Sequence, residues 1–135
     1  SITKDVVELN ESGTRKTVGT ITVTETANGV SIDLEAKGLA LESGMAELHL
    51  YGKNSPQTTK DSKASSVNGG GLGEDIRDLG ALMVNADGSI SQTIVSDGIK
   101  FSDIEGKSLV ITDEVDNYAN SLADGSEEPL YVASF

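Results

Sequence analysis

The sequence predicts a single all-β domain over residues 1–135, built as an antiparallel sandwich or barrel. Two observations predict this fold class. Apolar and polar residues alternate with a period of two along many short segments, which is typical of half-buried strands. Turns rich in Gly, Asn and Asp separate these segments, and no segment has a convincing helical period. A chain of 135 residues can also bury a hydrophobic core without a disulfide or a metal.

The clearest element is a hairpin formed by residues 20–26 and 30–36. The first segment is rich in β-branched residues, and in the second Val, Ile and Leu alternate with Ser, Asp and Glu. Asn28-Gly29 lies between them and predicts a type I′ turn, because Asn and Gly accept the positive φ angles that this turn requires. We therefore expect the two segments to pair as antiparallel strands.

A β-bulge and several further strands are predicted elsewhere in the chain. Val18 is out of phase with Ile21, and Gly19 between them is typical of a bulge. The further strand segments alternate or form short apolar runs, with turn residues at several of their boundaries. These segments comprise residues 46–51, 81–84, 90–95, 99–101, 109–111 and 130–135.

Two long polar loops interrupt the strands, at residues 53–78 and 113–129. The first contains a glycine-rich stretch at residues 69–73, which is not a phosphate-binding P-loop because no Lys-Ser/Thr pair follows it. Loops longer than about 12–15 residues often carry function, so both are candidate functional regions. The second has no basic side chain and six acidic ones: Asp113, Glu114, Asp116, Asp124, Glu127 and Glu128.

Composition excludes several classes of function. Ten basic and 22 acidic residues give a net charge of −12, which opposes binding to nucleic acid phosphates. No run approaches the ~20 apolar residues of a membrane span, so we expect no membrane segment. The chain has no cysteine and one histidine, which excludes a thiol nucleophile, a disulfide and a multi-histidine metal site within one chain.

The single histidine, His49, shares a predicted strand face with Glu47 and Tyr51, opposite Leu48 and Leu50. We expect Leu48 and Leu50 to be buried, and His49 and Tyr51 to point away from the core toward the loops. A metal ligand or general base would need partner groups, and no second His or Cys supplies them. The pattern therefore favours an outward-facing strand histidine over a functional one.

The order of strands and loops resembles that of the bacterial periplasmic copper-zinc superoxide dismutases over nearly the whole chain. The resemblance implies a Greek-key β-barrel, with copper held by four histidines and zinc by three histidines and an aspartate, one histidine being shared. The segments that carry it are residues 18–26 with Asn28-Gly29, Leu48-His49-Leu50-Tyr51, residues 59–65, Asp75-Ile76-Arg77-Asp78-Leu79, residues 81–88, and residues 109–112 followed by Asp116-Asn117.

Most of the ligand positions that this resemblance implies are changed. His49 keeps a copper histidine and Asp78 keeps the zinc aspartate, whereas Tyr51 and Thr112 stand at two further copper positions. The bridging histidine falls in a deletion after residue 65 or 66. Other implied positions are Val67 and Asp75 for zinc, Leu130 for the arginine that guides superoxide, Ala133 for a cysteine, and Asp116 for the aspartate that tethers ligating histidines.

These changes predict a non-catalytic scaffold with the superoxide dismutase fold. One histidine beside a phenol and a hydroxyl cannot supply the imidazoles that copper needs, so we expect no catalytic residue, no cofactor and no bound metal, with His49 and Asp78 as vestigial positions. The acidic chain favours a basic protein or peptide as partner, for example a lysozyme-like protein that it would inhibit. Its expected binding residues are Asp113, Glu114 and Asp116.

An alternative is a degenerate homologue that binds copper or zinc weakly through His49, Tyr51 and Asp78. The resemblance also implies a periplasmic or secreted protein whose signal peptide has been removed. Consistent with this, the first residues contain neither an initiator Met nor the apolar region of a signal peptide.

Overall fold

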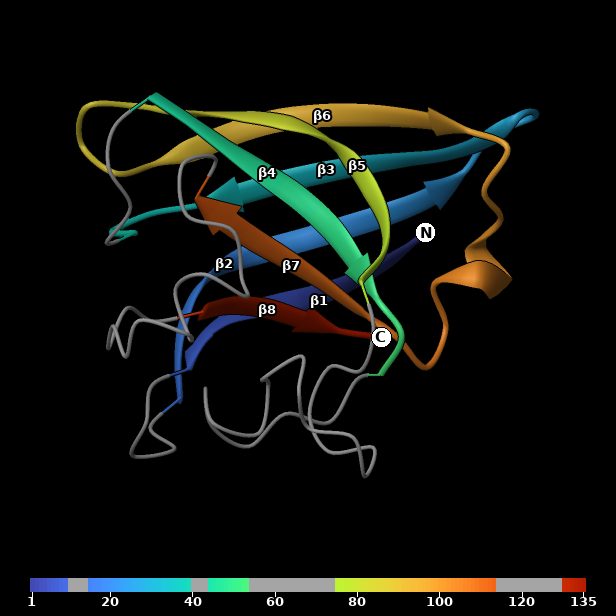
Figure 1. The fold of residues 1–135 in the computed structure, drawn as a ribbon, viewed down its shortest axis with the longest axis horizontal. Helices are drawn as coiled ribbons and strands as arrows, with labels where there is room; N and C mark the ends of the chain where they lie inside the picture. The colour runs from blue at the N-terminus through green and yellow to red at the C-terminus, as the bar shows by residue number, and fades with distance from the viewer. Residues whose placement is uncertain (10–14, 40–43, 54–74, 114–129) are drawn as a thin grey trace.

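The computed structural model describes residues 1–9, 15–39, 44–53, 75–113 and 130–135. These residues form eight strands, each paired antiparallel with its neighbours in the order β5-β4-β7-β8-β1-β2-β3-β6. The sheet curls into a nearly closed barrel (Figure 1), which confirms the predicted all-β antiparallel fold. The strands are β1 (Ile2–Leu9), β2 (Arg15–Glu25), β3 (Gly29–Ala36), β4 (Gly44–Tyr51), β5 (Asp75–Val84), β6 (Ile90–Asp97), β7 (Ser108–Asp113) and β8 (Leu130–Ser134).

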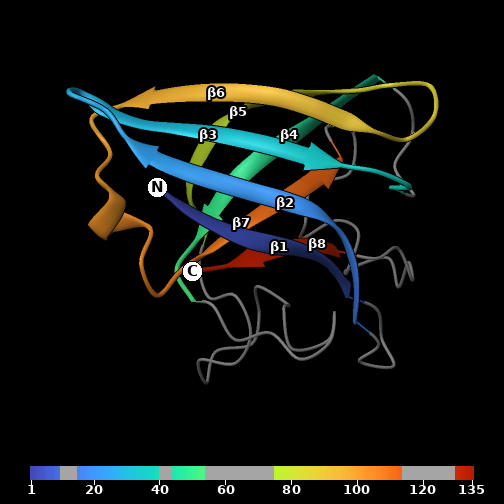
Figure 2. The same cartoon turned by 180° about the vertical axis from the view of Figure 1, so that it is seen from behind.

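The connections have Greek-key character. After β4, β5 and β6, the chain returns so that β7 pairs with β4 on the side away from β5. β8 then lies between β7 and β1. Figure 1 shows β4 and β7 crossing in front of β2 and β3, and Figure 2 shows β2, β3 and β6 from behind. The two sides of the barrel therefore enclose one interior.

A glutamine side chain bridges β5 and β6, the two ends of the strand order. Gln92 Oε1 accepts a hydrogen bond from the Met83 backbone N–H at 2.9 Å. Its Nε2 donates to the Ala81 carbonyl at 2.8 Å. The Gln92 side chain thus satisfies one backbone donor and one backbone acceptor of β5, although β5 and β6 do not pair as neighbouring strands.

The predicted hairpin is confirmed, but its turn type is wrong. β2 and β3 pair from Gly19↔Ala36 to Glu25↔Val30, and the turn is closed by the Thr26 N–H donating to the Gly29 carbonyl at 2.8 Å. Among the described residues no non-glycine has positive φ, and Gly29 is not among the glycines that do, so the turn is not type I′.

Glycine at position 29 is required for a different reason. A Cβ on Gly29 would lie 2.0 Å from the Ser96 carbonyl oxygen of β6, so only glycine permits this close approach of strands. The predicted bulge near Gly19 is confirmed: Val6 pairs with Gly19 and Val7 with Thr17, which leaves Val18 as the extra residue.

The barrel interior holds the main hydrophobic core, to which every strand contributes. Leu48 is fully buried and Leu50 is 2 % exposed, as the alternation of β4 predicts. The largest fully buried side chains are Tyr131, Leu9, Ile21, Ile32, Leu34, Leu48, Leu50, Leu82, Ile90, Ile104 and Leu109.

Two segments differ from the sequence-based expectation. Residues 99–101 were expected to form a strand, but Phe101–Asp103 form a 3-10 turn, in which the Asp103 carboxylate accepts from the Lys100 N–H at 2.8 Å. β5 begins at Asp75, inside the predicted loop of residues 53–78, because the chain there pairs with β4 despite its polar sequence. Most of both predicted loops lies outside the described residues.

Within the described ranges, no helix has the length and apolar character needed to cross a membrane.

Candidate functional site

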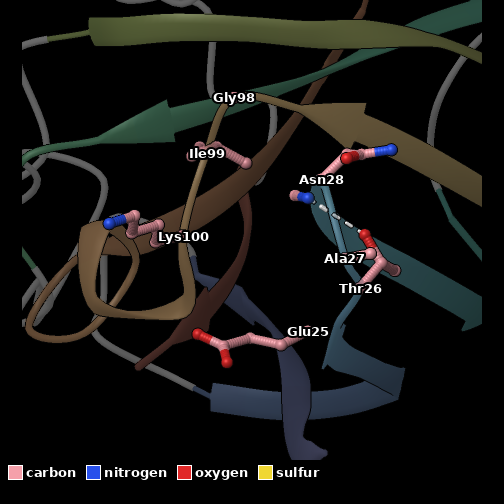
Figure 3. A pocket seen from close by; sticks show the side chains of 8 residues that line it. Glu25, Thr26, Ala27, Asn28, Gly98, Ile99 and Lys100 are labelled. Carbon is pink, nitrogen blue, oxygen red and sulfur yellow. Dashed lines mark hydrogen bonds between the residues drawn. The ribbon is translucent and has the colours of Figure 1, made fainter.

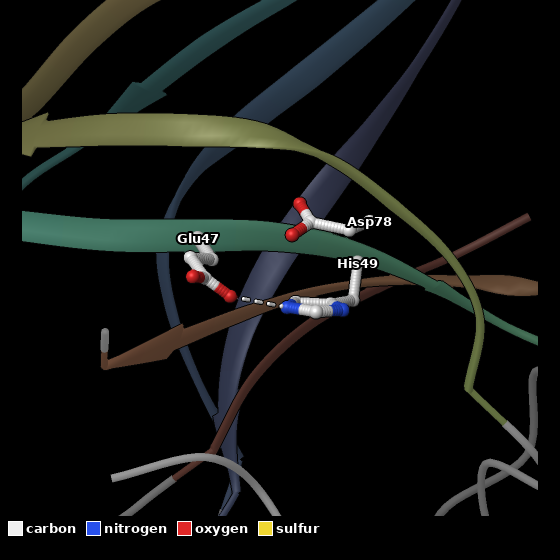
Figure 4. Close-up of side chains that lie close together, drawn as sticks. All are labelled: Glu47, His49 and Asp78. Atoms are coloured by element: carbon white, nitrogen blue, oxygen red, sulfur yellow. Dashed lines mark hydrogen bonds and ion pairs between the residues drawn. The ribbon is translucent and has the colours of Figure 1, made fainter. Parts of the chain in front are cut away.

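The candidate site lies on the outer face of β4 and β5, where three potential metal-ligating side chains converge (Figure 4). His49 Nε2 lies 2.8 Å from Glu47 Oε2, and the two side chains are 13 % and 30 % exposed. Asp78 comes from β5 and is directly opposite His49 in the strand pairing. Ligand atoms of Glu47, His49 and Asp78 all lie within 4.8 Å of one another.

A β-bulge brings Asp78 to this face. Leu48 pairs with Gly80 but His49 pairs with Asp78, so Leu79 is an extra residue in β5. Without the bulge, Asp78 would oppose Leu50 and share its inward face, since side chains alternate along a strand. The bulge instead leaves Leu79 in the core, 7 % exposed, and turns Asp78 outward. A hydrogen bond from the Gly80 N–H to Asp78 Oδ1 at 2.9 Å holds this carboxylate.

Sequence reasoning named His49 and Asp78 but did not assign Glu47 as a ligand. The available signal was the i, i+2 spacing of Glu47 and His49, which puts both side chains on one face of a strand. The alternation of apolar and polar residues in the sequence did not predict the bulge in β5. The cluster depends on that bulge, because it moves Asp78 by one position relative to β4.

Tyr51 lies on the outer face as predicted, yet it is buried, with 3 % exposure. It belongs to a second apolar cluster outside the barrel interior, which we call the outer cluster: Leu9, Tyr51, Val110, Leu130 and Val132, with Val7 packed against it. The Tyr51 and His49 rings are tilted, with centroids 6.4 Å apart. Apolar side chains of β1, β7 and β8 pack around Tyr51, and most of the two loops toward which it was predicted to point lies outside the described residues.

The strand register explains how the outer cluster adjoins the candidate site. Asp78, His49, Val110, Val132 and Val7 lie in one row across β5, β4, β7, β8 and β1. The row changes from ionisable to apolar side chains between β4 and β7. The candidate site is thus the polar margin of an otherwise apolar face.

Thr112, at a predicted copper position, is also buried, with 5 % exposure. It pairs with Glu47 across β7 and β4. Among the residues that the structure describes, its Oγ1 atom has no hydrogen-bond partner. A buried hydroxyl left without a partner has a free-energy cost, so this atom is available to a water or ligand.

The other predicted site residues are placed only in part. Asp113 ends β7 opposite Ala46, and nothing is described of its side chain. Glu114 and Asp116, predicted to bind a partner, lie outside the described residues, as does Val67. Leu130 and Ala133, at the positions of the substrate-guiding arginine and a cysteine, are buried apolar residues of β8.

A separate hollow of about 410 Å³ lies where the β2–β3 turn meets the end of β6 (Figure 3). Glu25 and Lys100 give it charges of opposite sign, and the Asn28 carbonyl accepts a hydrogen bond from the Gly98 N–H at 2.8 Å. It contains no histidine, and His49 is the chain's only one.

Comparisons with known proteins agree with the fold. The family described as copper/zinc superoxide dismutase matches residues 17–130. A copper-zinc superoxide dismutase of Escherichia coli K12 is 31 % identical over 134 residues, covering 84 % of this chain and 76 % of that protein.

Two solved structures resemble the whole barrel. The copper/zinc superoxide dismutase from Brucella abortus has a TM-score of 0.64 and 19 % identity, covering 98 % of this chain and 99 % of that one. A superoxide dismutase-like protein from Bacillus subtilis has a TM-score of 0.60 and 20 % identity, covering 96 % and 97 % of the two chains. These likenesses concern the fold.

Proposed function

We propose that this chain, which belongs to the copper/zinc superoxide dismutase family, is a non-catalytic member whose ancestral copper face has become a packing surface. The observation that supports this most is the burial of Tyr51, at an implied copper position, within the outer cluster. A phenol surrounded by Leu and Val side chains stabilises packing. It does not replace an imidazole at copper.

The donors do not fit a redox copper centre. Copper that cycles between oxidation states in this family is held by four imidazoles, and His49 is the only histidine among the 135 residues. Thr112 supplies a hydroxyl at another copper position, which is a poor copper ligand compared with imidazole. Copper bound at these positions would have too few imidazole ligands for the redox cycle of the family.

The charge distribution also opposes dismutation, because superoxide is an anion. Leu130 stands at the position of the guiding arginine and is 7 % exposed. A net charge of −12 repels anionic substrates and lowers their encounter rate. Both the ligand set and the electrostatic field therefore disfavour the reaction of the family.

A dismutation assay tests this proposal. The purified protein, incubated with copper and zinc and then freed of unbound metal, should show no rate above that of a metal-free blank. The E. coli copper-zinc enzyme, treated identically, is the positive control. A rate within about tenfold of that control, equivalent to only about 1.4 kcal/mol in activation free energy, would overturn the proposal.

We further propose that the barrel binds a basic protein or peptide in the periplasm or outside the cell. The net charge of −12 supports this, together with a polar outer face on β3 and β6. There Asp33 and Glu35 accept hydrogen bonds from the Thr93 and Ser91 hydroxyls. Opposite charge accelerates encounter of two proteins, and salt screens it beyond about 8 Å at physiological strength.

Surface plasmon resonance with a lysozyme as the basic probe tests this partner class. Affinity should fall as salt rises, and changing Asp113, Glu114 and Asp116 together to amides should slow association while changing dissociation less. The same triple change elsewhere on the strands, at Asp5 of β1 and Asp33 and Glu35 of β3, separates a loop effect from a global charge effect. Equal binding at low and high salt would exclude electrostatic recognition of the probe.

A further inference from the structure

We propose that the free edge of β6 binds an extended segment of a basic partner protein, which adds to the sheet as a further strand. This inference rests on the proposed function in that the partner is basic, and it adds where and in which conformation that partner binds. β5 and β6 are the two ends of the strand order, and among the described residues no strand pairs with this edge of β6. Figure 1 shows β5 curving away from β6 beyond the turn that joins them.

The backbone of β6 presents hydrogen-bonding groups at this edge. In an antiparallel pair, the N–H and C=O groups of alternate residues point toward the partner strand, and those of the residues between them point away. The Asp97 carbonyl accepts a hydrogen bond from the Arg77 guanidinium of β5 at 3.3 Å, so it points away from β3. Thr93 and Val95 follow the same alternation and therefore direct their N–H and C=O groups to the free edge. A peptide strand can pair with such groups, as it does in other complexes formed by strand addition.

β6 lacks the features by which edge strands usually resist pairing. These features are bulges, prolines and charged side chains, above all lysine. The sequence of β6 contains no proline and no basic residue, and Asp97 is its only charged side chain. Its pairs with β3, from Gly29↔Asp97 to Ala36↔Ile90, continue without a shift of register. The free edge is therefore regular along the whole strand.

The inward side of β6 favours apolar side chains on an added strand. Gln92 and Ile94 face inward, yet both are only half-buried. Leu34 and Ile32, which pair with them on β3, are at most 1 % exposed. An apolar side chain on the inward face of an added strand would remove further surface of Ile94 from water, which stabilises the complex.

The outward side of β6 favours basic side chains instead. Thr93, Val95 and Asp97 are exposed there, Val95 by 65 %. Asp33 of β3 pairs with Thr93, and Asp78 of β5 is exposed on the other side of this edge. A lysine stem can pack along Val95 while its ammonium group approaches a carboxylate. A second copy of this chain fits less well, because two chains of charge −12 repel each other.

Arg77 competes with an added strand for one acceptor. Its guanidinium occupies the Asp97 carbonyl, and Arg77 is the only basic residue of β5. A bound strand would replace this exposed side chain with a backbone N–H. Arg77 therefore opposes a basic peptide in two ways, because it occupies the acceptor and adds a positive charge.

Fluorescence polarisation with a labelled peptide of the same length as β6, alternating Lys and Val, tests the edge. We expect saturable binding that weakens as salt rises. The same peptide with a methyl group on every backbone nitrogen keeps its charge but has no backbone N–H to donate. It should bind about tenfold or more weakly, because it loses several hydrogen bonds.

A matched pair of protein variants tests the role of Arg77. Arg77→Ala should tighten binding of the unmodified peptide by about threefold or more, the effect of one weak hydrogen bond. Lys16→Ala on β2 removes the same charge from an exposed position away from this edge, so it should tighten binding less.

Amide hydrogen exchange locates the bound strand. The Thr93 and Val95 amides should exchange more slowly in the complex, because their N–H groups point to the free edge. The Ile94 amide points to β3 and is the internal control, since only a general gain in stability would slow it.

The strand addition is overturned if the unmodified peptide does not bind, if the N-methylated peptide binds as tightly, or if exchange at Thr93 and Val95 is unchanged at saturation. Slower exchange at these amides with rising protein concentration and no peptide would also overturn it, by assigning the edge to a second copy of the chain. Lysozyme binding in any of these cases leaves the proposed basic partner intact. Conversely, a peptide with Thr in place of each Lys that binds equally well and slows the same amides supports the edge and rejects the basic partner.

Discussion

The two sides of the barrel share one interior but differ on the outside. On β3 and β6 the outward side chains are exposed or half-buried and, apart from Val95, mostly polar, and Asp33 and Thr93 are exposed. On β7 and β8 most outward side chains are buried, and Val110 and Val132 are fully buried in the outer cluster. β8 is consequently buried on both of its faces, whereas β3 is buried on only one.

The buried outer face coincides with the face on which the family resemblance places copper ligands. The interior needs the same alternation on both sides, since it serves the same core. The outer face of β4, β7 and β8 contains the implied copper positions, and two of them now hold the buried side chains of Tyr51 and Thr112. Under the proposed function, this face packs side chains at positions where the family holds copper. The polar face carries hydroxyl and carboxylate groups instead.

The largest expected effect comes from the interior that both sides share. Leu50→Ala should lower the free energy of unfolding by about 2–5 kcal/mol, because Leu50 is 2 % exposed and its truncation leaves a cavity. Urea or thermal denaturation measures this. Leu50→Met, which nearly conserves volume, should cost less than about 1.5 kcal/mol. Similar costs for both variants would mean that the side-chain volume retained by Met does not reduce the cost.

A matched pair of valines tests the comparison directly. Val132→Ala in the outer cluster should cost about 1.5–3 kcal/mol, the value of a fully buried valine. Val95→Ala, also outward-facing but 65 % exposed on β6, should cost less than about 0.5 kcal/mol. Denaturant unfolding of the two variants gives the difference. Equal costs would show that the outer cluster contributes no more stability than an exposed face.

The bridge between β5 and β6 should have a smaller effect. Gln92→Ala removes both hydrogen bonds to β5 and should cost about 0.5–1.5 kcal/mol, since water can replace part of the pairing. Gln92→Glu keeps an acceptor for the Met83 N–H but sets a carboxylate oxygen against the Ala81 carbonyl oxygen, so it should not restore the stability of the original chain. Hydrogen exchange of the Met83 amide should speed up in Gln92→Ala. Unchanged exchange would mean that the bridge does not protect this strand.

The smallest effect concerns the turn before β6. The Ser89 hydroxyl donates to Asp87 Oδ1 at 2.6 Å and the Ser89 N–H donates at 3.1 Å, which lowers the pKa of Asp87. A carboxyl with a lowered pKa stabilises the fold above its unfolded pKa and loses this contribution as pH falls through the folded value. Ser89→Ala should raise the pKa of Asp87, measurable by NMR titration. Ser91→Ala, whose hydroxyl contacts Glu35, should leave it unchanged.

The sequence predicted those parts of the fold in which local pattern and burial agree. The β2–β3 hairpin and the bulge at Val18 followed from alternation and its interruption. β1 was missed because Lys4 interrupts the inward face and two consecutive apolar residues, Val6 and Val7, break the period. The start of β5 was missed because strand pairing with β4, and not hydrophobic patterning, makes it a strand.

The candidate site was likewise predicted only in part. His49 and Asp78 were recognised through resemblance to a family, whereas Glu47 needed the three-dimensional register. Burial of Tyr51 could not be predicted either. Alternation gives the face of a side chain, but the apolar neighbours on that face come from β1, β7 and β8. The alternation of apolar and polar residues therefore does not predict contacts between strands that are far apart in sequence.

The position of β8 also has a consequence for the order of folding events. β5-β4-β7 and β1-β2-β3-β6 are two groups of strands, and β8 is the only strand whose ladders join them among the described residues. β8 is also the last strand along the chain, pairing Val132 with Val7. Contacts of such long sequence separation form slowly, because much chain entropy is lost before they stabilise anything. We therefore expect both strand groups to remain partly exposed to solvent during folding until β8 pairs with β7 and β1.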